Sequence, residues 1–214
     1  MKMNDEKGMI RKVTLAKEAS AEMTEKKSVF IGHAKPIGSE EEALEFIKAK
    51  KKEFSDATHN VFAYVLNGGV TAKYSDDGEP QGTAGMPVLD VIRKSGIDDA
   101  VVVVTRYFGG ILLGAGGLVR AYSASAKLAL DTAGITVFEY YDEFEIRCGY
   151  SDYQRIKNEL PAFGVKTDSS AFEGEVTLKI AVRQDRSDSL ILKITELTAA
   201  RAVINKLGER FDHD

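Results

Sequence analysis

Residues 101–120 read VVVVTRYFGGILLGAGGLVR, and this stretch decides the fold of the first part of the chain. Four consecutive valines are typical of a strand that is buried on both faces, as the strands of parallel sheets are. Glycines then interrupt the hydrophobic run, and apolar residues at helical spacing continue from about Ala115 to Ala133, before Gly134. The stretch therefore predicts a buried strand of the parallel type at about 99–105, a glycine-rich loop and a long helix.

The loop after this strand carries the candidate ligand-binding residues. Arg106 follows the predicted strand, at the C-terminal end where α/β folds often place functional groups. The segment 114–117 (GAGG) opens the helix as a phosphate-binding loop would, although it lacks the Lys-Ser/Thr of a Walker loop. Alternatively, these glycines only allow the helix to pack closely on the sheet. The candidate ligand-binding residues are Arg106, Tyr107, Gly109, Gly110, Gly114, Gly116, Gly117 and Arg120.

A second glycine-dense stretch, YSDDGEPQGTAG, lies upstream at 74–85. Asp76, Asp77 and Glu79 place three carboxylates around one glycine, which suits a hard cation or the hydroxyl groups of a ligand. A solvated turn is the alternative, because Asp and Gly are favoured in turns for backbone reasons. A predicted helix at about 84–94 follows, and free amides at its start would favour an anion. These three acids and His59 are the candidate catalytic residues, although a lone histidine is more often structural.

Further elements follow from local patterns. In the first part they are a strand at 28–37, a helix at 39–52 and a hairpin of strands at 60–66 and 70–74. From Thr136 the remaining elements follow the order βαββαβ of a ferredoxin-like domain. We therefore expect two domains, 1–137 and 138–214, and an α/β fold class made of α+β two-layer sandwiches.

Composition and charge restrict the function. The 214 residues carry a net charge of −4, and this excess of acid lies in residues 139–214, which hold 11 Lys and Arg against 15 Asp and Glu. A dedicated non-specific nucleic-acid binder is usually basic, so any attraction for an anion must be local. No apolar run approaches the length of a membrane span, and the first ten residues lack a signal-peptide core. We expect a cytoplasmic protein without a membrane partner.

Several enzyme classes find no support in the sequence. A Ser-His-Asp order and an HExxH motif are both absent, so hydrolytic chemistry is not indicated. The one cysteine, Cys148, excludes an intramolecular disulfide and is typical of a small packed residue in a strand. No metal-ligand set and no cofactor is indicated, and we expect a binding protein rather than an enzyme.

The motifs together resemble a known family. The segments ATHN at 57–60, SDDGEPQGTAG at 75–85 and VVVTRYFGGILLGAGGLVRAYSASA at 102–126 are similar to the signature of the YigZ/IMPACT family. The resemblance spans about residues 20–130. It implies a first domain like the second domain of ribosomal protein S-five, which is also the fold of galactokinase-type kinases. The second part resembles the small domain of bacterial members, similar to a C-terminal domain of elongation factor G.

The resemblance also implies a function in translation. Eukaryotic relatives regulate translation by competing for the activator of the amino-acid-starvation kinase. We therefore expect a regulatory binding protein that contacts RNA, the ribosome or another protein of the translation machinery through the DDGEP and RYFGG loops. The alternative is an enzyme or sensor that binds a phosphorylated small molecule or a nucleotide at the glycine-rich loop. Leu112 stands where many relatives carry lysine, which removes one anion contact from this loop.

Overall fold

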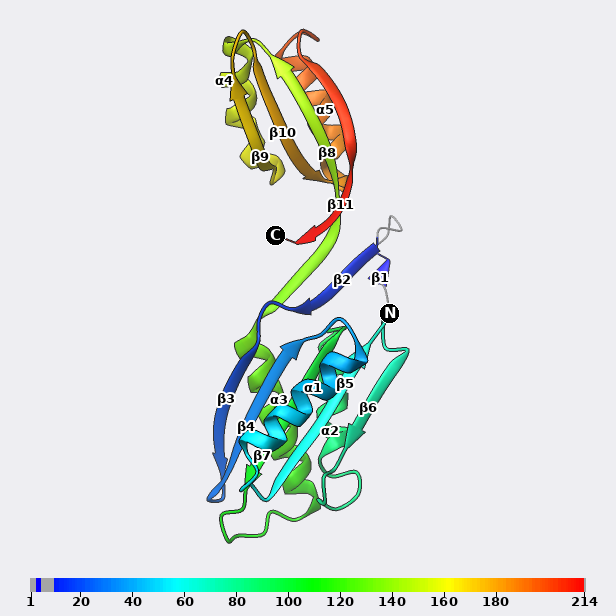
Figure 1. Cartoon of the computed structure of the whole chain (residues 1–214), viewed down its shortest axis with the longest axis vertical. Coiled ribbons are helices and arrows are strands. Elements are labelled where there is room, and N and C mark those ends of the chain that lie inside the picture. The colour runs from blue at the N-terminus through cyan, green and yellow to red at the C-terminus, as the bar shows by residue number, and fades with distance from the viewer. Residues whose placement is uncertain (1–2, 5–9, 214) are drawn as a thin grey trace. The chain divides into compact units, whose positions relative to one another are not determined.

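The valine run lies in β7, the central strand of a five-stranded sheet in the computed structural model, which describes residues 3–4 and 10–213 (Figure 1). The strand order is β3-β4-β7-β5-β6, and every neighbouring pair is antiparallel. The strands are β3 (Ala19–Glu25), β4 (Ser28–Pro36), β5 (His59–Leu66), β6 (Thr71–Ser75) and β7 (Ala100–Tyr107). The prediction of a buried strand is confirmed, but the prediction of the parallel type is wrong, because an apolar run indicates burial on two faces and not the direction of the neighbours.

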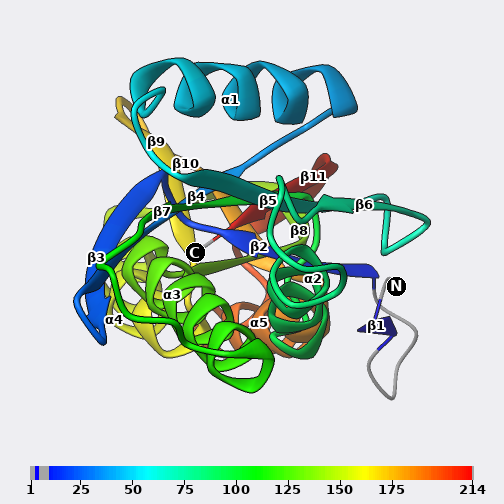
Figure 2. The same ribbon diagram turned by 90° about the horizontal axis from the view of Figure 1, so that it is seen from below.

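Helices cover both faces of this sheet (Figure 2). Helix α1 (Glu40–Glu53) lies on one face, while α2 (Gly85–Lys94) and α3 (Ala115–Ala133) lie side by side on the other. Because side chains alternate along β7, Val101 and Val103 pack in the core beneath α1, and Val102 and Val104 pack in the core beneath α2 and α3. The α/β class is confirmed, and α1 adds a third layer to this part of the chain.

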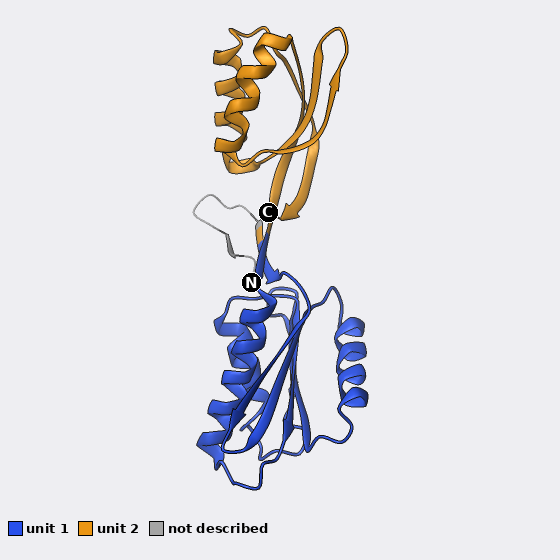
Figure 3. Cartoon of the chain, turned by 90° about the vertical axis from the view of Figure 1, so that its left-hand side faces the viewer, with its two compact units in different colours: residues 1–3, 12–137 blue, residues 4–11, 138–214 orange. Residues whose placement is uncertain are grey.

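The chain divides into two units between Val137 and Phe138 (Figure 3). Among the described residues near the N-terminus, Asn4, Ile10 and Arg11 group with the second unit, although most of the first unit follows them in sequence. Strands β1 (Met3–Asn4), β2 (Ile10–Leu15) and β3 are found in a region for which the sequence predicted no elements. Their short, highly charged runs carry a weaker hydrophobic signal than the valines of β7.

The second unit has the predicted βαββαβ order. Its elements are β8 (Ile135–Cys148), α4 (Tyr150–Glu159), a short 3₁₀ helix (Leu160–Phe163), β9 (Lys166–Phe172), β10 (Val176–Arg183), α5 (Gln184–Leu197) and β11 (Val203–His213). The sheet runs β1-β2-β8-β10-β9, and β11 pairs with β8. Helices α4 and α5 pack on one face through a core that includes Ile146, Ile156 and Leu190. Among the described helices, none is long and apolar enough to cross a membrane.

Candidate functional site

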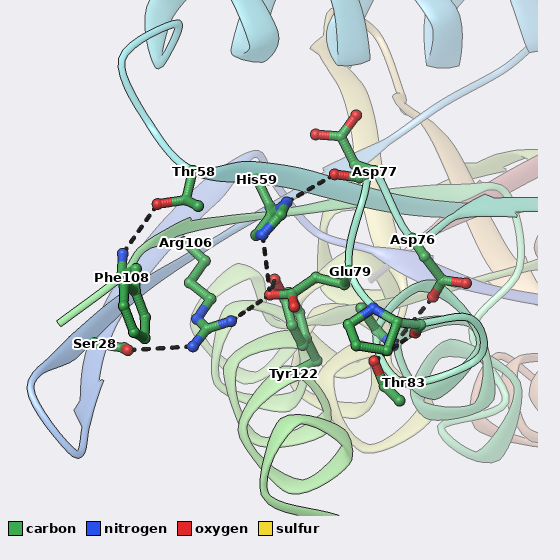
Figure 4. Close-up of polar contacts among 12 residues, drawn as sticks. Ser28, Thr58, His59, Asp76, Asp77, Glu79, Thr83, Arg106, Phe108 and Tyr122 are labelled. Atoms are coloured by element: carbon green, nitrogen blue, oxygen red, sulfur yellow. Dashed lines mark hydrogen bonds and ion pairs between the residues drawn. The ribbon is translucent and has the colours of Figure 1, made fainter. Parts of the chain in front are cut away.

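Glu79 and Arg106 bring the two glycine-dense stretches together inside the first unit (Figure 4). Arg106 lies near the end of β7, and its Nη1 donates to Glu79 Oε1 over 2.5 Å. The hydroxyl of Tyr122, from α3, donates to the same oxygen over 2.7 Å. The two charged side chains are 4% and 6% exposed, so water reaches neither of them freely. A buried charge is costly unless it is paired, and each residue here satisfies the other.

Aromatic rings enclose the Arg106 guanidinium. Its central carbon lies 5.4 Å from the centre of the Phe30 ring and 5.5 Å from the centre of the Phe108 ring. Phe30 also meets Tyr122 edge to face, with 5.2 Å between ring centres. Burial, followed by the hydrogen bond to Glu79, raises the pKa of Tyr122 above its ordinary value, so its hydroxyl stays protonated and keeps donating. The result is a rigid cluster of Glu79, Arg106 and Tyr122.

Asp76 occupies the amides that the sequence offered to an anion at the start of α2. Its carboxylate accepts from the backbone N–H groups of Gly82, Ala84 and Gly85 over 2.8–3.1 Å. A carboxylate at this position satisfies the free amides of the helix and suits its dipole. The expected anion site at α2 is therefore filled by the chain's own side chain.

Asp77 and His59 hold the same loop against the start of β5. Asp77 accepts from the backbone N–H of Asn60 over 2.6 Å and pairs with Lys51 over 2.5 Å. His59 Nδ1 lies 2.8 Å from the carbonyl oxygen of Asp77, and its Nε2 lies 3.7 Å from Glu79 Oε1. Among the described residues, no group of three or more His, Cys, Asp and Glu side chains is placed to hold a metal ion. Asp76 and Asp77 thus each accept hydrogen bonds from the backbone of this part of the chain.

The loop after β7 is fixed by contacts with the start of β4, the turn before it and the segment between α1 and β5. Ser28 Oγ accepts from the N–H of Gly109 over 3.1 Å, and Thr58 Oγ1 accepts from the N–H of Phe108 over 3.1 Å. A Cβ atom at Gly109 would lie 2.0 Å from the backbone of Lys27, so only glycine allows this close approach. Tyr107 donates its hydroxyl to Asp56 over 2.9 Å.

Beyond these anchors the loop is open to solvent. Phe108 is 46% exposed and Leu112 is 84% exposed, and Ile111 is also exposed. Arg120 Nη1 lies 3.6 Å from where a Cβ atom added to Gly116 would be, so the guanidinium lies over the first turn of α3. Gly114, at the N-cap of this helix, has no side chain to bond the free amides. Lys26 and Lys27, in the turn between β3 and β4, are exposed beside the loop. We call Phe108, Ile111, Leu112, Lys26, Lys27 and Arg120 the loop surface.

The comparisons with known proteins agree with the motifs. The Impact N-terminal domain family matches residues 26–130, and a domain family of unknown function (DUF1949) matches residues 146–201. The chain is 37% identical to IMPACT family member YvyE of Bacillus subtilis (strain 168), over 94% of this chain and 93% of that protein. The chain belongs to the IMPACT family. IMPACT family member YigZ of Escherichia coli (strain K12) is 35% identical over 73% of this chain and 78% of that protein.

A solved structure supports the fold of this IMPACT family member. It is described as the crystal structure of a hypothetical protein, with a TM-score of 0.58 and 29% identity over 91% of this chain and 96% of that chain. This chain therefore has a mixed α/β architecture with two antiparallel sheets.

The structure separates the predicted site residues into two groups. Asp76, Asp77, Glu79, Arg106 and Tyr107 are held by bonds within the protein, while Gly110, Gly114, Gly116 and Arg120 remain open. Sequence reasoning missed Tyr122, Ser28 and Phe30, which complete the buried cluster. The sequence offered one indication of Tyr122: it lies five residues after Gly117 in the predicted helix, on the side that is buried in α3. Lys26 and Lys27 lie about 80 residues away in sequence from the loop they adjoin, and no local pattern links them to it.

Proposed function

We propose that this IMPACT family member is a regulatory binding protein of translation that contacts RNA, free or within the ribosome, through the loop surface. The observation that carries the proposal is a half-exposed aromatic ring, Phe108, in a loop that adjoins Lys27 and leads to Arg120, two exposed cations that have no ion-pair partner among the described residues. Single-stranded nucleic acids are bound by stacking of bases on aromatic rings and by cations on the phosphates.

The buried cluster prepares Phe108 for this contact. One side of the ring faces the Arg106 guanidinium, which Glu79 holds in place, and the backbone N–H of Phe108 is bound by Thr58. A ring that is already immobilised loses little conformational entropy when a base stacks on it. The first glycine-dense stretch therefore acts at a distance, by fixing Arg106 and so the ring above it.

The cations suit a phosphate chain in position and in charge. Arg120 lies over the uncapped first turn of α3, so its charge adds to that of the helix N-terminus. The backbone of Lys27 adjoins the loop at Gly109, and Lys26 precedes it in the same exposed turn. Because the first 138 residues are neutral as a whole, such a surface attracts an anion locally and not through the overall field of the protein.

The alternative, a phosphorylated small molecule or nucleotide, draws on Arg120 and the start of α3 alone. It would leave the exposed Phe108, Ile111 and Leu112 without a role, and Asp76, Asp77 and Glu79 are engaged within the protein. A thermal-shift screen of nucleotides with and without Mg²⁺ distinguishes the two. Stabilisation by a nucleotide that Arg120→Gln abolishes would favour the alternative.

Fluorescence anisotropy with a labelled single-stranded 12-nucleotide RNA tests the proposal directly. We expect Phe108→Ala to cost about 1–3 kcal/mol of binding free energy, the usual contribution of one stacked base. Arg120→Gln should reduce the slope of the logarithm of the binding constant against the logarithm of salt concentration by about one, the value of one lost phosphate contact.

Lys48→Gln is the matched control, because Lys48 is exposed on α1, which covers the face of the sheet opposite to α2 and α3. Equal affinities of the wild type, Phe108→Ala and Arg120→Gln at every salt concentration would overturn the proposal. Binding of a translation protein that survives nuclease treatment and needs Phe108 would point to a protein ligand instead.

A further inference from the structure

Strand β9 forms one border of the sheet in the second unit, with β10 as its strand partner among the described residues (Figure 1). A border strand presents unpaired N–H and C=O groups along its outer side, and another chain can pair with them. The pairing with β10 is irregular at Asp168: Thr167 and Ser169 pair with consecutive residues of β10, and Asp168 between them has no partner there. Such a bulge disturbs the first half of the strand. The second half, Ser169–Phe172, is regular and exposed.

This half-strand lacks the protection that three other border strands carry. Border strands usually avoid pairing with other chains through charged side chains, prolines or bulges. In the described sheets, β3 carries Glu22, β6 carries Lys73, and β11 carries a register shift between Lys206 and Gly208. Residues 169–171 are Ser, Ser and Ala, whose small uncharged side chains allow close approach of another backbone.

Two half-exposed aromatic rings lie at the end of the same half-strand. Tyr150 and Phe172 are both 51% exposed, with ring centres 6.5 Å apart. Tyr153 supports Phe172 edge to face, with 5.2 Å between ring centres, and the Tyr150 hydroxyl donates to the carbonyl of Glu173 over 2.7 Å. The two rings are therefore fixed while their outer faces stay open, as a site for a flat or cationic side chain requires.

The charges beside these rings select a basic occupant. Glu173 and Glu175, in the turn between β9 and β10, are exposed and have no ion-pair partner among the described residues. Arg147 of β8 lines a shallow hollow together with Glu173 and Glu175, but its guanidinium is paired with Glu145 over 2.8 Å. The chain from residue 139 onward carries a net charge of −4, so two copies of this unit repel each other while a basic segment is attracted.

We propose that an extended basic segment of a partner protein adds as a strand to Ser169–Phe172. Its backbone pairs with the open edge of β9, and one of its Lys or Arg side chains lies on Tyr150 and Phe172, close to the turn that carries Glu173 and Glu175. Strand addition supplies affinity through the main chain, and the neighbouring side chains supply specificity. The surface lies on the second unit and is independent of the RNA contact proposed above.

The test uses the full chain and a fluorescein-labelled decapeptide of alternating Lys and Thr, followed by fluorescence anisotropy. We expect binding of this peptide, and none of the alternating Glu and Thr peptide. Two further versions of the Lys peptide distinguish strand addition from charge attraction. One is N-methylated on the backbone at the odd-numbered residues and the other at the even-numbered residues. At least one of them should lose binding, because N-methylation removes the donors while the charge is retained.

Variants of the chain locate the site. Tyr150→Ala should weaken peptide binding about two- to fivefold, and the double variant Glu173→Gln/Glu175→Gln by a similar factor. The matched control Asp188→Asn/Glu196→Gln removes two exposed carboxylates from α5 and should leave binding unchanged. Binding of both N-methylated peptides as tight as that of the unmethylated Lys peptide, or an equal loss in the control variant, would overturn the proposal. A dimer in sedimentation velocity that Tyr150→Ala abolishes would show that a second copy occupies the edge, and would also overturn it.

Discussion

Glu79 Oε1 lies 2.5 Å from Arg106 Nη1 in the interior of the first unit, where both side chains are almost fully excluded from solvent. The contact joins two segments 27 residues apart and connects the acidic loop to the ring of Phe108 through the guanidinium. It therefore stabilises the fold and also positions the exposed loop surface.

Breaking this pair should cost much of the stability of the first unit. Glu79→Gln leaves the buried Arg106 charge without its counterion, and we expect a loss of about 3–5 kcal/mol in the free energy of unfolding. Urea denaturation followed by circular dichroism measures this loss. Glu41→Gln, at an exposed position of α1, is the control and should change the stability little. A Glu79→Gln protein as stable as the control would show that the buried charge finds another partner.

Removing the cap of α2 should have a smaller effect. Asp76→Ala frees the backbone N–H groups of Gly82, Ala84 and Gly85, and we expect a loss of about 0.5–2 kcal/mol in unfolding free energy. Asp90→Asn changes an aspartate of the same helix that accepts no hydrogen bond from a described residue. Equal stabilities of the two variants in urea would contradict the assignment of Asp76 as the cap.

Gly109 should not accept even a methyl group. A Cβ there would lie 2.0 Å from the backbone of Lys27, so Gly109→Ala must push the loop away from the turn between β3 and β4. We expect a loss of about 1–3 kcal/mol in thermal or urea unfolding, as for an overpacked interior. Gly149→Ala is the comparison, since nothing lies within 4 Å of its added Cβ. Unchanged stability of both variants would mean that the loop is free to move.

The stability of the first unit should depend on pH through His33. Burial, with a smaller effect of the Lys50 charge, lowers the pKa of His33 from 6.5 to about 4, while the nearby Glu53 acts in the opposite direction. The ring also stacks on Phe54 and bonds to Ser20 Oγ over 2.8 Å. Because the unfolded chain binds this proton at a higher pH than the folded chain, stability should fall as pH decreases from about 6.5 to about 4, and the effect should be complete below that.

A His33→Gln variant isolates this contribution. The difference in unfolding free energy between wild type and variant should change by about 2 kcal/mol across this pH window, since solvent screens part of the full effect. Titration of the His33 ring by NMR checks the pKa independently. A His33 pKa near 6.5 in the folded protein would contradict the expected pH dependence.

The sequence located nearly every helix and strand of the two units after residue 28. Helix α3 begins and ends where the pattern of apolar residues and Gly134 indicated, and α1 closely matches the predicted range, with Ser39 as its cap. Strands β2 and β3 were missed, because their short charged runs carry little periodicity of their own and gain their stability from pairing.

The candidate site could be predicted only in part from the sequence. Both glycine-dense stretches could be recognised from local composition, and the structure shows that Glu79 and Arg106 bring them together. The roles of their side chains could not be predicted, because whether an acid is free or bonded depends on groups distant in sequence, such as Tyr122 for Glu79 and Lys51 for Asp77.

The sequence by itself determined where the elements, the tight turns and the glycine-rich loop lie, since these depend on neighbouring residues and on backbone conformations that few residue types adopt. Only the tertiary structure decided that β7 is antiparallel to both neighbours, that Arg106 is buried against Glu79, and that Phe108 and Arg120 remain exposed. These depend on the register of strands far apart in the chain and on the cost of burying a charge without a partner.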